Sequence, residues 1–141
     1  AVDRVGLMLG LRFPCGMELE RLAEQNTESV KVRPTLKGCD CCLSGVENRC
    51  KKLLESGKSR EYVAAFCIES IRVTLSAMTD AIFEKYGSMP VVYAGGVMSN
   101  KIIKNSFEEK YNAVFAEPVF SSDNAAGIAY LCFRKFENVY T

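Results

Sequence analysis

Residues 91–118 read VVYAGGVMSNKIIKNSFEEKYNAVFAEP and carry the pattern that decides the fold. A short apolar run ends in two glycines, an amphipathic segment follows, and a second short apolar run closes the stretch. Together with the residue before it, this pattern predicts a strand over 90–96, a helix over 97–111 and a second strand over 112–118. Two strands joined by a helix pair in parallel, so the stretch indicates an α/β fold.

Helical periodicity dominates the rest of the chain. Over 59–87, apolar residues recur near 3.6-residue spacing for about seven turns, which predicts the central core helix. Shorter helices are expected over 3–10, 17–25, 45–57 and 122–136. We also expect an alternating edge strand over 28–34 and a turn with a strand of small residues over 36–45.

The bulk composition fits one compact globular unit or one lobe of a larger protein. The chain has 141 residues, of which 48% are hydrophobic, and a formal net charge of +1. A charge this small gives no global field that would attract nucleic acid or a membrane. No apolar run approaches the roughly 20 residues of a bilayer span, and the start AVDRVGLML lacks the features of a secretory signal. We therefore expect a cytoplasmic protein without a membrane partner.

Two residue types restrict the chemistry. The chain has seven cysteines, an odd number in a sequence rich in apolar residues, which favours reduced thiols over a disulfide scaffold. It has no histidine, which removes Ser-His and Cys-His catalysis and histidine-containing zinc sites unless another chain supplies that residue. Carboxylates, amides, lysines, thiols and backbone N–H groups remain.

Cys39, Cys41 and Cys42 lie close together in the sequence CDCC, and Cys50 follows in the next helix. These four thiols could be interpreted as a metal cluster. The spacing contains adjacent thiols and no C-x-x-C pair, however, which fits tetrahedral zinc poorly. We interpret the cysteines instead as small apolar residues of a strand.

Gly95 and Gly96 stand where the first predicted strand meets a helix. Backbone N–H groups and the positive end of a helix dipole gather at such a junction, and glycine has no Cβ to keep a ligand at a distance. The pair therefore indicates an anion or nucleotide site. Glycines at a strand end also serve simply as a turn, so other motifs must support this interpretation.

Four stretches support it through a family resemblance. The chain contains VDRVGLMLGLRFPCGMELERLAEQ, CLSGVENRCKKLL, VVYAGGVMSNKIIKN and FSSDNAAGIAYLCF in this order. These resemble the patterns DK-A-LLGL-YPGG---LA, FSGLK, AGGV--N and TDN-AMIAY of the universal tRNA threonylcarbamoyladenosine transferases (TsaD/Gcp), once called O-sialoglycoprotein endopeptidases. The resemblance covers nearly the whole chain. It implies an α/β, ribonuclease-H-like fold of the actin, hexokinase and Hsp70 ATPase class (ASKHA).

The resemblance also implies that a part is missing. Members of the family have two lobes, and the first carries an His-x-x-x-His metal-binding pair. Residues 1–141 resemble only the second, C-terminal lobe, so the N-terminal metal-binding lobe is absent from this chain. The chain is either a fragment or a natural truncation. We expect a fragment, because a nucleotide cleft between two lobes cannot be built from one.

Several site residues follow from the matched motifs. Asp3 matches the aspartate that contacts the hydroxyl-bearing part of the substrate, although it could instead be a helix N-cap. Gly16 matches the second glycine of YPGG, where the backbone approaches the ligand, while Cys15 replaces the first glycine and alters that turn. Asn100 matches the asparagine of AGGV--N, whose amide reaches the nucleotide beside Gly95 and Gly96.

Asp123 matches the aspartate of TDN, the one metal ligand that the family takes from its second lobe. Ser122 or Asp123 is also a good cap for the helix that follows, and capping and coordination can coexist. Gly127 replaces the large residue of MIAY, from which we expect only a change in packing. No catalytic residue is assigned within this chain.

The implied reaction moves threonylcarbamoyl from its adenylate to the exocyclic amine of a tRNA adenosine. The implied cofactors are ATP or threonylcarbamoyl-adenylate and a divalent metal, which could be iron, zinc or magnesium and is shared with the missing lobe. The implied partners are the N-terminal lobe, a homologous partner subunit, the ATPase of the tRNA-modification complex, and tRNA. We expect this chain alone to be inactive.

Two alternatives remain open. Cys15 and Gly127, at motif positions, fit a non-catalytic relative or partner subunit that acts as a protein-interaction module. A metalloprotease is the weaker alternative, because the chain offers no pair of protein ligands and no general base for peptide hydrolysis. A preceding His-x-x-x-His segment would favour the enzyme over the interaction module.

Overall fold

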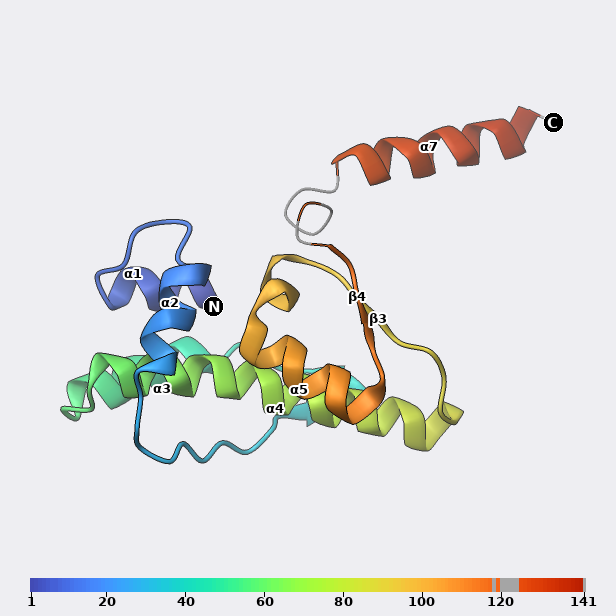
Figure 1. The fold of residues 1–141 in the computed structure, drawn as a ribbon. Coiled ribbons are helices and arrows are strands. Elements are labelled where there is room, and N and C mark those ends of the chain that lie inside the picture. The colour runs from blue at the N-terminus through green and yellow to red at the C-terminus, as the bar shows by residue number, and fades with distance from the viewer. Residues whose placement is uncertain (118, 120–124, 141) are drawn as a thin grey trace.

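The long helix α4, Arg60–Tyr86, runs through the centre of the computed structural model, which describes residues 1–117, 119 and 125–140 (Figure 1). Ser59 caps it, because its hydroxyl accepts the backbone N–H of Tyr62 at 3.1 Å. Gly87, with φ of 84°, ends it in a conformation that favours glycine. The helix predicted over 59–87 is thus confirmed.

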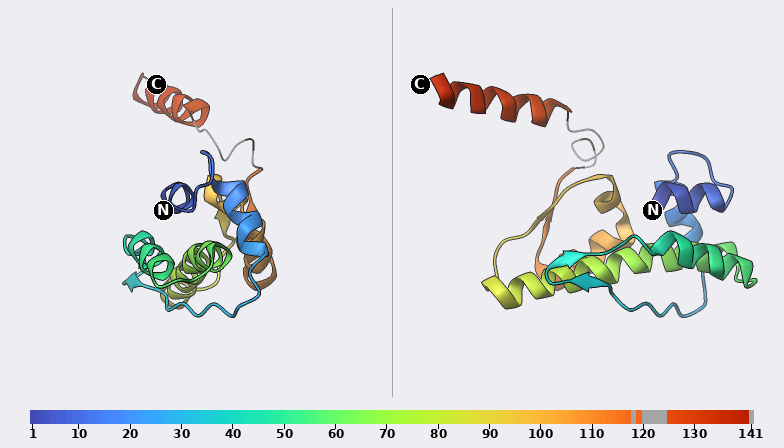
Figure 2. Two further views of the ribbon diagram at one scale, coloured as in Figure 1. Left: turned by 90° about the vertical axis from the view of Figure 1, so that its left-hand side faces the viewer. Right: turned by 180° about the vertical axis from the view of Figure 1, so that it is seen from behind.

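The other helices in the described part of the chain are α1 (Val2–Met8), α2 (Gly16–Glu24), α3 (Val46–Glu55), the 3-10 helix η1 (Gly96–Ser99), α5 (Lys101–Tyr111) and α7 (Ala125–Tyr140). Of these, α1, α2, α3 and α5 pack against α4. The left view of Figure 2, nearly along α4, shows α3 on one side of it and α5 on the other. In Figure 1, α7 lies apart from these helices. Within the described residues, no helix is long and apolar enough to cross a membrane.

Four very short strands form two separate pairs in the part of the chain that the structure describes. Strands β1 (Leu36–Lys37) and β2 (Asp40–Cys41) are antiparallel, whereas β3 (Val92–Tyr93) and β4 (Val114–Phe115) are parallel. Val92 pairs with Val114 and Tyr93 with Phe115, and α5 connects the two strands. The parallel pair predicted from the strand–helix–strand pattern is confirmed, and the fold is mixed α/β with mostly helices.

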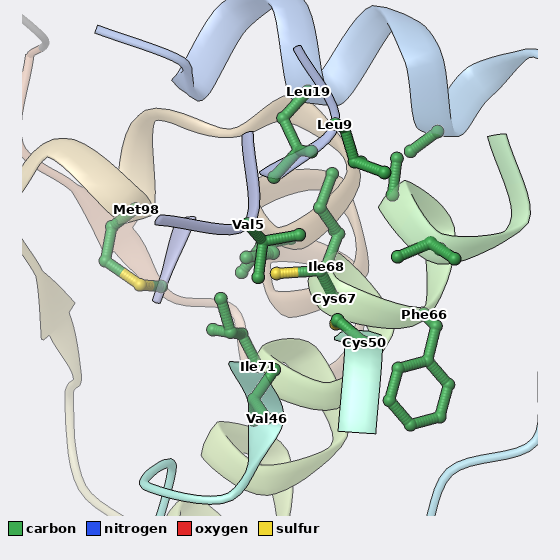
Figure 3. Packing of buried hydrophobic residues seen from close by; sticks show 14 of the residues in the cluster. Val5, Leu9, Leu19, Val46, Cys50, Phe66, Cys67, Ile68, Ile71 and Met98 are labelled. Carbon is green, nitrogen blue, oxygen red and sulfur yellow. The ribbon is translucent and has the colours of Figure 1, made fainter. Parts of the chain in front are cut away.

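The core lies where α1, α2, α3 and α5 meet α4. Figure 3 shows side chains of this cluster, among them Val5, Leu19 and Cys67, each fully buried. A second part of the cluster is aromatic: Tyr93 stacks on Phe115 and meets Phe107 edge to face, with centroids 5.3 and 5.0 Å apart. These contacts attach the parallel strands to α5.

Three local expectations are wrong. Residues 28–34 form no strand; their alternation reflects burial of Val30 and Val32 against the core without a neighbouring strand to pair with. The helix expected over 97–111 is broken at Asn100, whose ψ of 124° is extended. Cys41 lies in β2 as expected, but Cys41 and Cys42 are exposed, so they are not the small apolar residues that we expected. All seven cysteines are free thiols in this structure.

Candidate functional site

The glycine pair forms an open turn at the end of β3. Gly95 has φ of 109° and ψ of 155°, which a side chain would strain. The carbonyl oxygen of Gly95 accepts the N–H of Met98 at 2.9 Å, and this is the first hydrogen bond of η1. The side chain of Met98 is buried and holds η1 in place (Figure 3). A Cβ added at Gly95 or Gly96 would meet no atom within 4 Å. A ligand can therefore approach this backbone closely.

The start of α5 already has partners within the chain. The side-chain oxygen Oδ1 of Asn100 accepts the N–H of Ile103 at 3.1 Å. The carboxylate of Glu20 accepts the N–H of Lys101 at 3.2 Å. A carboxylate thus lies at the positive end of the α5 dipole, where a ligand phosphate would otherwise bind. Because Asn100 uses its oxygen as the cap, it can offer a ligand its NH₂ group as a donor.

Glu20 lies at this candidate site, and the sequence did not predict it. It lies on α2 one helical turn after Gly16, so both face the same side of that helix. Its bond to Lys101 joins the middle of α2 to the start of α5 across 81 positions of sequence. The spacing of four residues from Gly16 was the only signal in the sequence, and it does not reveal which helix Glu20 contacts.

Asp3 lies beside the turn that begins α2. Its oxygen Oδ1 accepts the backbone N–H of Cys15 at 2.9 Å, which fastens α1 to this turn. The alternative role as a helix N-cap is wrong, because Ala1 is the N-cap of α1 and Asp3 lies in its first turn. One carboxylate oxygen, Oδ2, is left to accept a bond from a ligand hydroxyl.

Cys15 does not disturb this turn in the way that a glycine replacement suggests. Its φ of −81° and ψ of −10° are ordinary for any residue. Its side chain is fully buried against α1, where a Cβ on Gly6 would lie 2.2 Å from the Cβ of Cys15. Burial, together with the nearby carboxylates of Asp3 and Glu18, raises the pKa of the Cys15 thiol, so this thiol stays neutral.

Gly16 is the exposed first residue of α2, and a Cβ there would meet no atom within 4 Å. Asp3 thus lies beside the turn before Gly16, and Glu20, one helical turn after Gly16, lies beside the start of α5 at Asn100. Gly95 and Gly96 are connected to Asn100 through η1, which leads directly into it. We call these five residues together with Glu20 the nucleotide face, after the ligand that the sequence predicts for them.

The metal prediction falls largely outside the structure. Asp123 lies outside the described residues, and Gly127 is half-buried in the first turn of α7. Among residues 1–117, 119 and 125–140, no three His, Cys, Asp or Glu side chains are grouped so that they could hold a metal ion. The four cysteines of the CDCC region are not brought together: Cys50 is buried between α3 and α4, whereas Cys41 and Cys42 face solvent.

Known proteins resemble this chain over most of its length. A protein from Thermus thermophilus named tRNA N6-adenosine threonylcarbamoyltransferase is 31% identical over 141 residues, which cover 97% of this chain and 43% of that protein. One of the same name from Thermococcus sibiricus is 30% identical over 143 residues, covering 97% and 44%. One from Endomicrobium trichonymphae is 31% identical over 159 residues, covering 99% and 46%.

The chain thus spans less than half the length of the curated relatives that it matches. The profile of the TsaD family, described as tRNA N6-adenosine threonylcarbamoyltransferase, matches residues 1–130. Because this match includes all four motifs and nearly the entire sequence, the chain belongs to the TsaD family.

Proposed function

We propose that residues 1–141 are the C-terminal lobe of a two-lobed tRNA threonylcarbamoyladenosine transferase with the ASKHA, ribonuclease-H-like fold. The lobe provides the nucleotide face, and the remainder of the protein closes the cleft over it. The hydrogen bond between Glu20 and the N–H of Lys101 carries this proposal, because it holds α2, the helix that begins at Gly16, against the Asn100 end of α5. Membership of the TsaD family also supports this proposed function.

Each part of the nucleotide face has a definite task in this proposal. The turn at Gly95 and Gly96 lets ATP or threonylcarbamoyl-adenylate approach the backbone. Asn100 donates from its NH₂ group, while the carboxylates of Asp3 and Glu20 accept hydroxyl groups, as ribose recognition requires. Since Glu20 already brings negative charge to the start of α5, the sugar is the part of the ligand that binds there, and the phosphate lies elsewhere.

Asp123 would be the one metal ligand that this lobe contributes, the remaining ligands coming from the other lobe. When bound, a divalent iron, zinc or magnesium ion would act as a Lewis acid and polarise the carbonyl of the threonylcarbamoyl group. The exocyclic amine of a tRNA adenosine forms the new bond to that carbonyl carbon, and the bond to AMP breaks. In the complete assembly, the partner subunit, the ATPase and tRNA contact the two-lobed protein.

The structure makes Gly96→Val a clean test of this proposal. A Cβ at Gly96 would meet no atom within 4 Å, so we expect the variant to fold while its new methyl groups occupy the ligand's space. We expect calorimetry on the full two-lobed protein to show loss of ATP or adenylate binding. Ser88→Val, before the opposite end of β3, is the control and should bind like the parent. If a folded Gly96→Val variant binds as well as the parent does, the glycine pair is only a turn and the nucleotide face fails.

The interaction-module alternative loses one of its two supports. Cys15 supports a non-catalytic interaction module only if its side chain alters the turn before Gly16, where the ligand is expected. That side chain is instead buried against Gly6. Gly127 remains, and the same calorimetric experiment separates the two functions, since an interaction module would bind no nucleotide.

A further inference from the structure

A shallow groove of about 360 Å³ lies between α3 and α4, and none of its residues belongs to the nucleotide face. It is lined by Arg49, Lys52, Leu53, Ser56 and Phe66. The first four share one stripe of α3, because they are spaced three or four residues apart along the helix. A surface formed by one helical stripe and one neighbouring helix is suited to a short peptide segment.

The floor of the groove is apolar. Figure 3 shows the ring of Phe66 turned away from the other labelled core side chains, and only 9% of this residue is exposed. Leu53 beside it is half-buried. A side chain that covers this floor would remove further apolar surface from water.

The rim of the groove is cationic. Arg49 and Lys52 are exposed, and within the described residues neither lies in an ion pair with a carboxylate. The guanidinium of Arg49 donates to the hydroxyl of Thr35 at 3.4 Å, which orients it without neutralising it. Lys51, on another side of α3, instead pairs with Glu55 at 3.9 Å. The positive charge of the groove is therefore available to a partner.

A second groove, of about 260 Å³, provides a contrast. Its lining includes the carboxylates of Glu28 and Glu69, but Lys58 neutralises the first and Arg72 the second. It has no uncompensated charge to select a partner, so charge complementarity favours the groove of α3 and α4.

We propose that this groove binds an acidic segment of a partner protein, with one aromatic or leucine side chain on Phe66 and flanking carboxylates on Arg49 and Lys52. Carboxylates match the forked donors of arginine, and apolar contact supplies the rest of the affinity. Nucleic acid fits less well, because two cations neutralise few phosphates.

An array of nonapeptides tests the proposal. Each peptide carries one Phe, Tyr or Leu flanked by Asp and Glu, and a matched set carries Lys and Arg instead. Fluorescence anisotropy with the chain of residues 1–141 should detect binding of acidic peptides only. The double variant Arg49→Glu/Lys52→Glu should weaken binding about tenfold or more, since two charge-assisted contacts become repulsive. Phe66→Leu should also weaken it, and circular dichroism checks the fold of each variant.

Lys51→Glu/Lys37→Glu is the matched control, because it changes the net charge equally without altering the groove. It should bind the acidic peptides within about twofold of the parent, as surface charges outside an interface contribute little. The proposal is overturned if no acidic peptide binds, if the control weakens binding as much as the groove variant, or if an unrelated tRNA displaces the bound peptide from Arg49 and Lys52.

Discussion

Compared with the family pattern, this chain has a smaller residue at position 6 and a larger one at position 15. At these positions DK-A has alanine and YPGG has glycine, whereas this chain has glycine and cysteine. The Cys15 side chain fills the space in which the methyl group of an alanine at position 6 would lie. The contact between α1 and the turn before α2 thus has room for only one side chain, so either position 6 or position 15 must be a glycine. The cysteine at position 15, which we expected to alter the ligand turn, therefore changes the packing against α1 instead.

This exchange predicts a strong coupling between the two positions. Gly6→Ala alone would normally stabilise a helix, but here it should destabilise the protein by about 1–3 kcal/mol, because the core becomes overpacked. Adding Cys15→Gly should recover most of that loss. Urea denaturation of the parent, the two single variants and the double variant gives the coupling free energy. Independent effects of the two substitutions would contradict the packing account.

Asn100 has two separable roles. Asn100→Ala removes the cap of α5 and should lower the free energy of unfolding by about 0.5–2 kcal/mol. Asn100→Asp keeps an oxygen for the N–H of Ile103 but loses the NH₂ donor, so stability should be retained while nucleotide affinity falls about tenfold. Thermal unfolding and calorimetry on the full two-lobed protein measure both quantities. Equal nucleotide affinity of the Asp variant and the parent would remove Asn100 from the nucleotide face.

At the scale of elements, predictions succeeded where local pattern and burial agree. The helix 60–86 is long and has a serine cap and a glycine end, and the strand–helix–strand pattern favours parallel pairing. The strand predicted over 28–34 is wrong because alternating apolar and polar residues indicate only that one side of the segment is buried. A loop that runs along the core has the same pattern. The position of Glu20 at the start of α5 depends on how α2 packs, and no local pattern encodes that.

A polar network holds α5 against the second half of α4. The hydroxyl of Tyr111 lies 2.7 Å from the hydroxyl of Ser76 and 2.8 Å from the carboxylate of Asp80, which also pairs with Lys110 at 2.6 Å. These contacts anchor the C-terminal end of α5, which is the opposite end of the helix from Asn100. The network was invisible in the sequence, because its members are separated by 30 or more residues.

Tyr111→Phe tests this attachment. It removes the hydroxyl but keeps the ring against Phe83 and Phe107, so the free energy of unfolding should fall by about 1–2 kcal/mol. Tyr86→Phe, at a residue that is 61% exposed, should change it by less than about 0.5 kcal/mol. Urea denaturation compares the two. Similar effects of both substitutions would mean that the network contributes no measurable stability.

At the scale of the whole molecule, large apolar side chains remain exposed on β3, β4 and α7. Parallel strands normally have both faces buried, yet Val92 is 68% and Val114 61% exposed. Helix α7 exposes large apolar side chains such as Leu131 and Phe136. The curated relatives are more than twice as long as the matched region, which agrees with further structure lying against these surfaces.

The proposed division of the protein into two lobes predicts the metal content. If Asp123 is the one metal ligand of this lobe, a single carboxylate leaves most coordination positions to water, and iron or zinc should dissociate readily. Residues 1–141 should therefore hold much less than one ion per chain after dialysis, and should not transfer threonylcarbamoyl to tRNA. The full two-lobed protein should keep its ion, and Asp123→Ala within it should release that ion. Elemental analysis by mass spectrometry measures all three samples. One tightly held ion per chain in residues 1–141 would mean that this lobe builds a complete metal site by itself, and the division of ligands between two lobes would have to be abandoned.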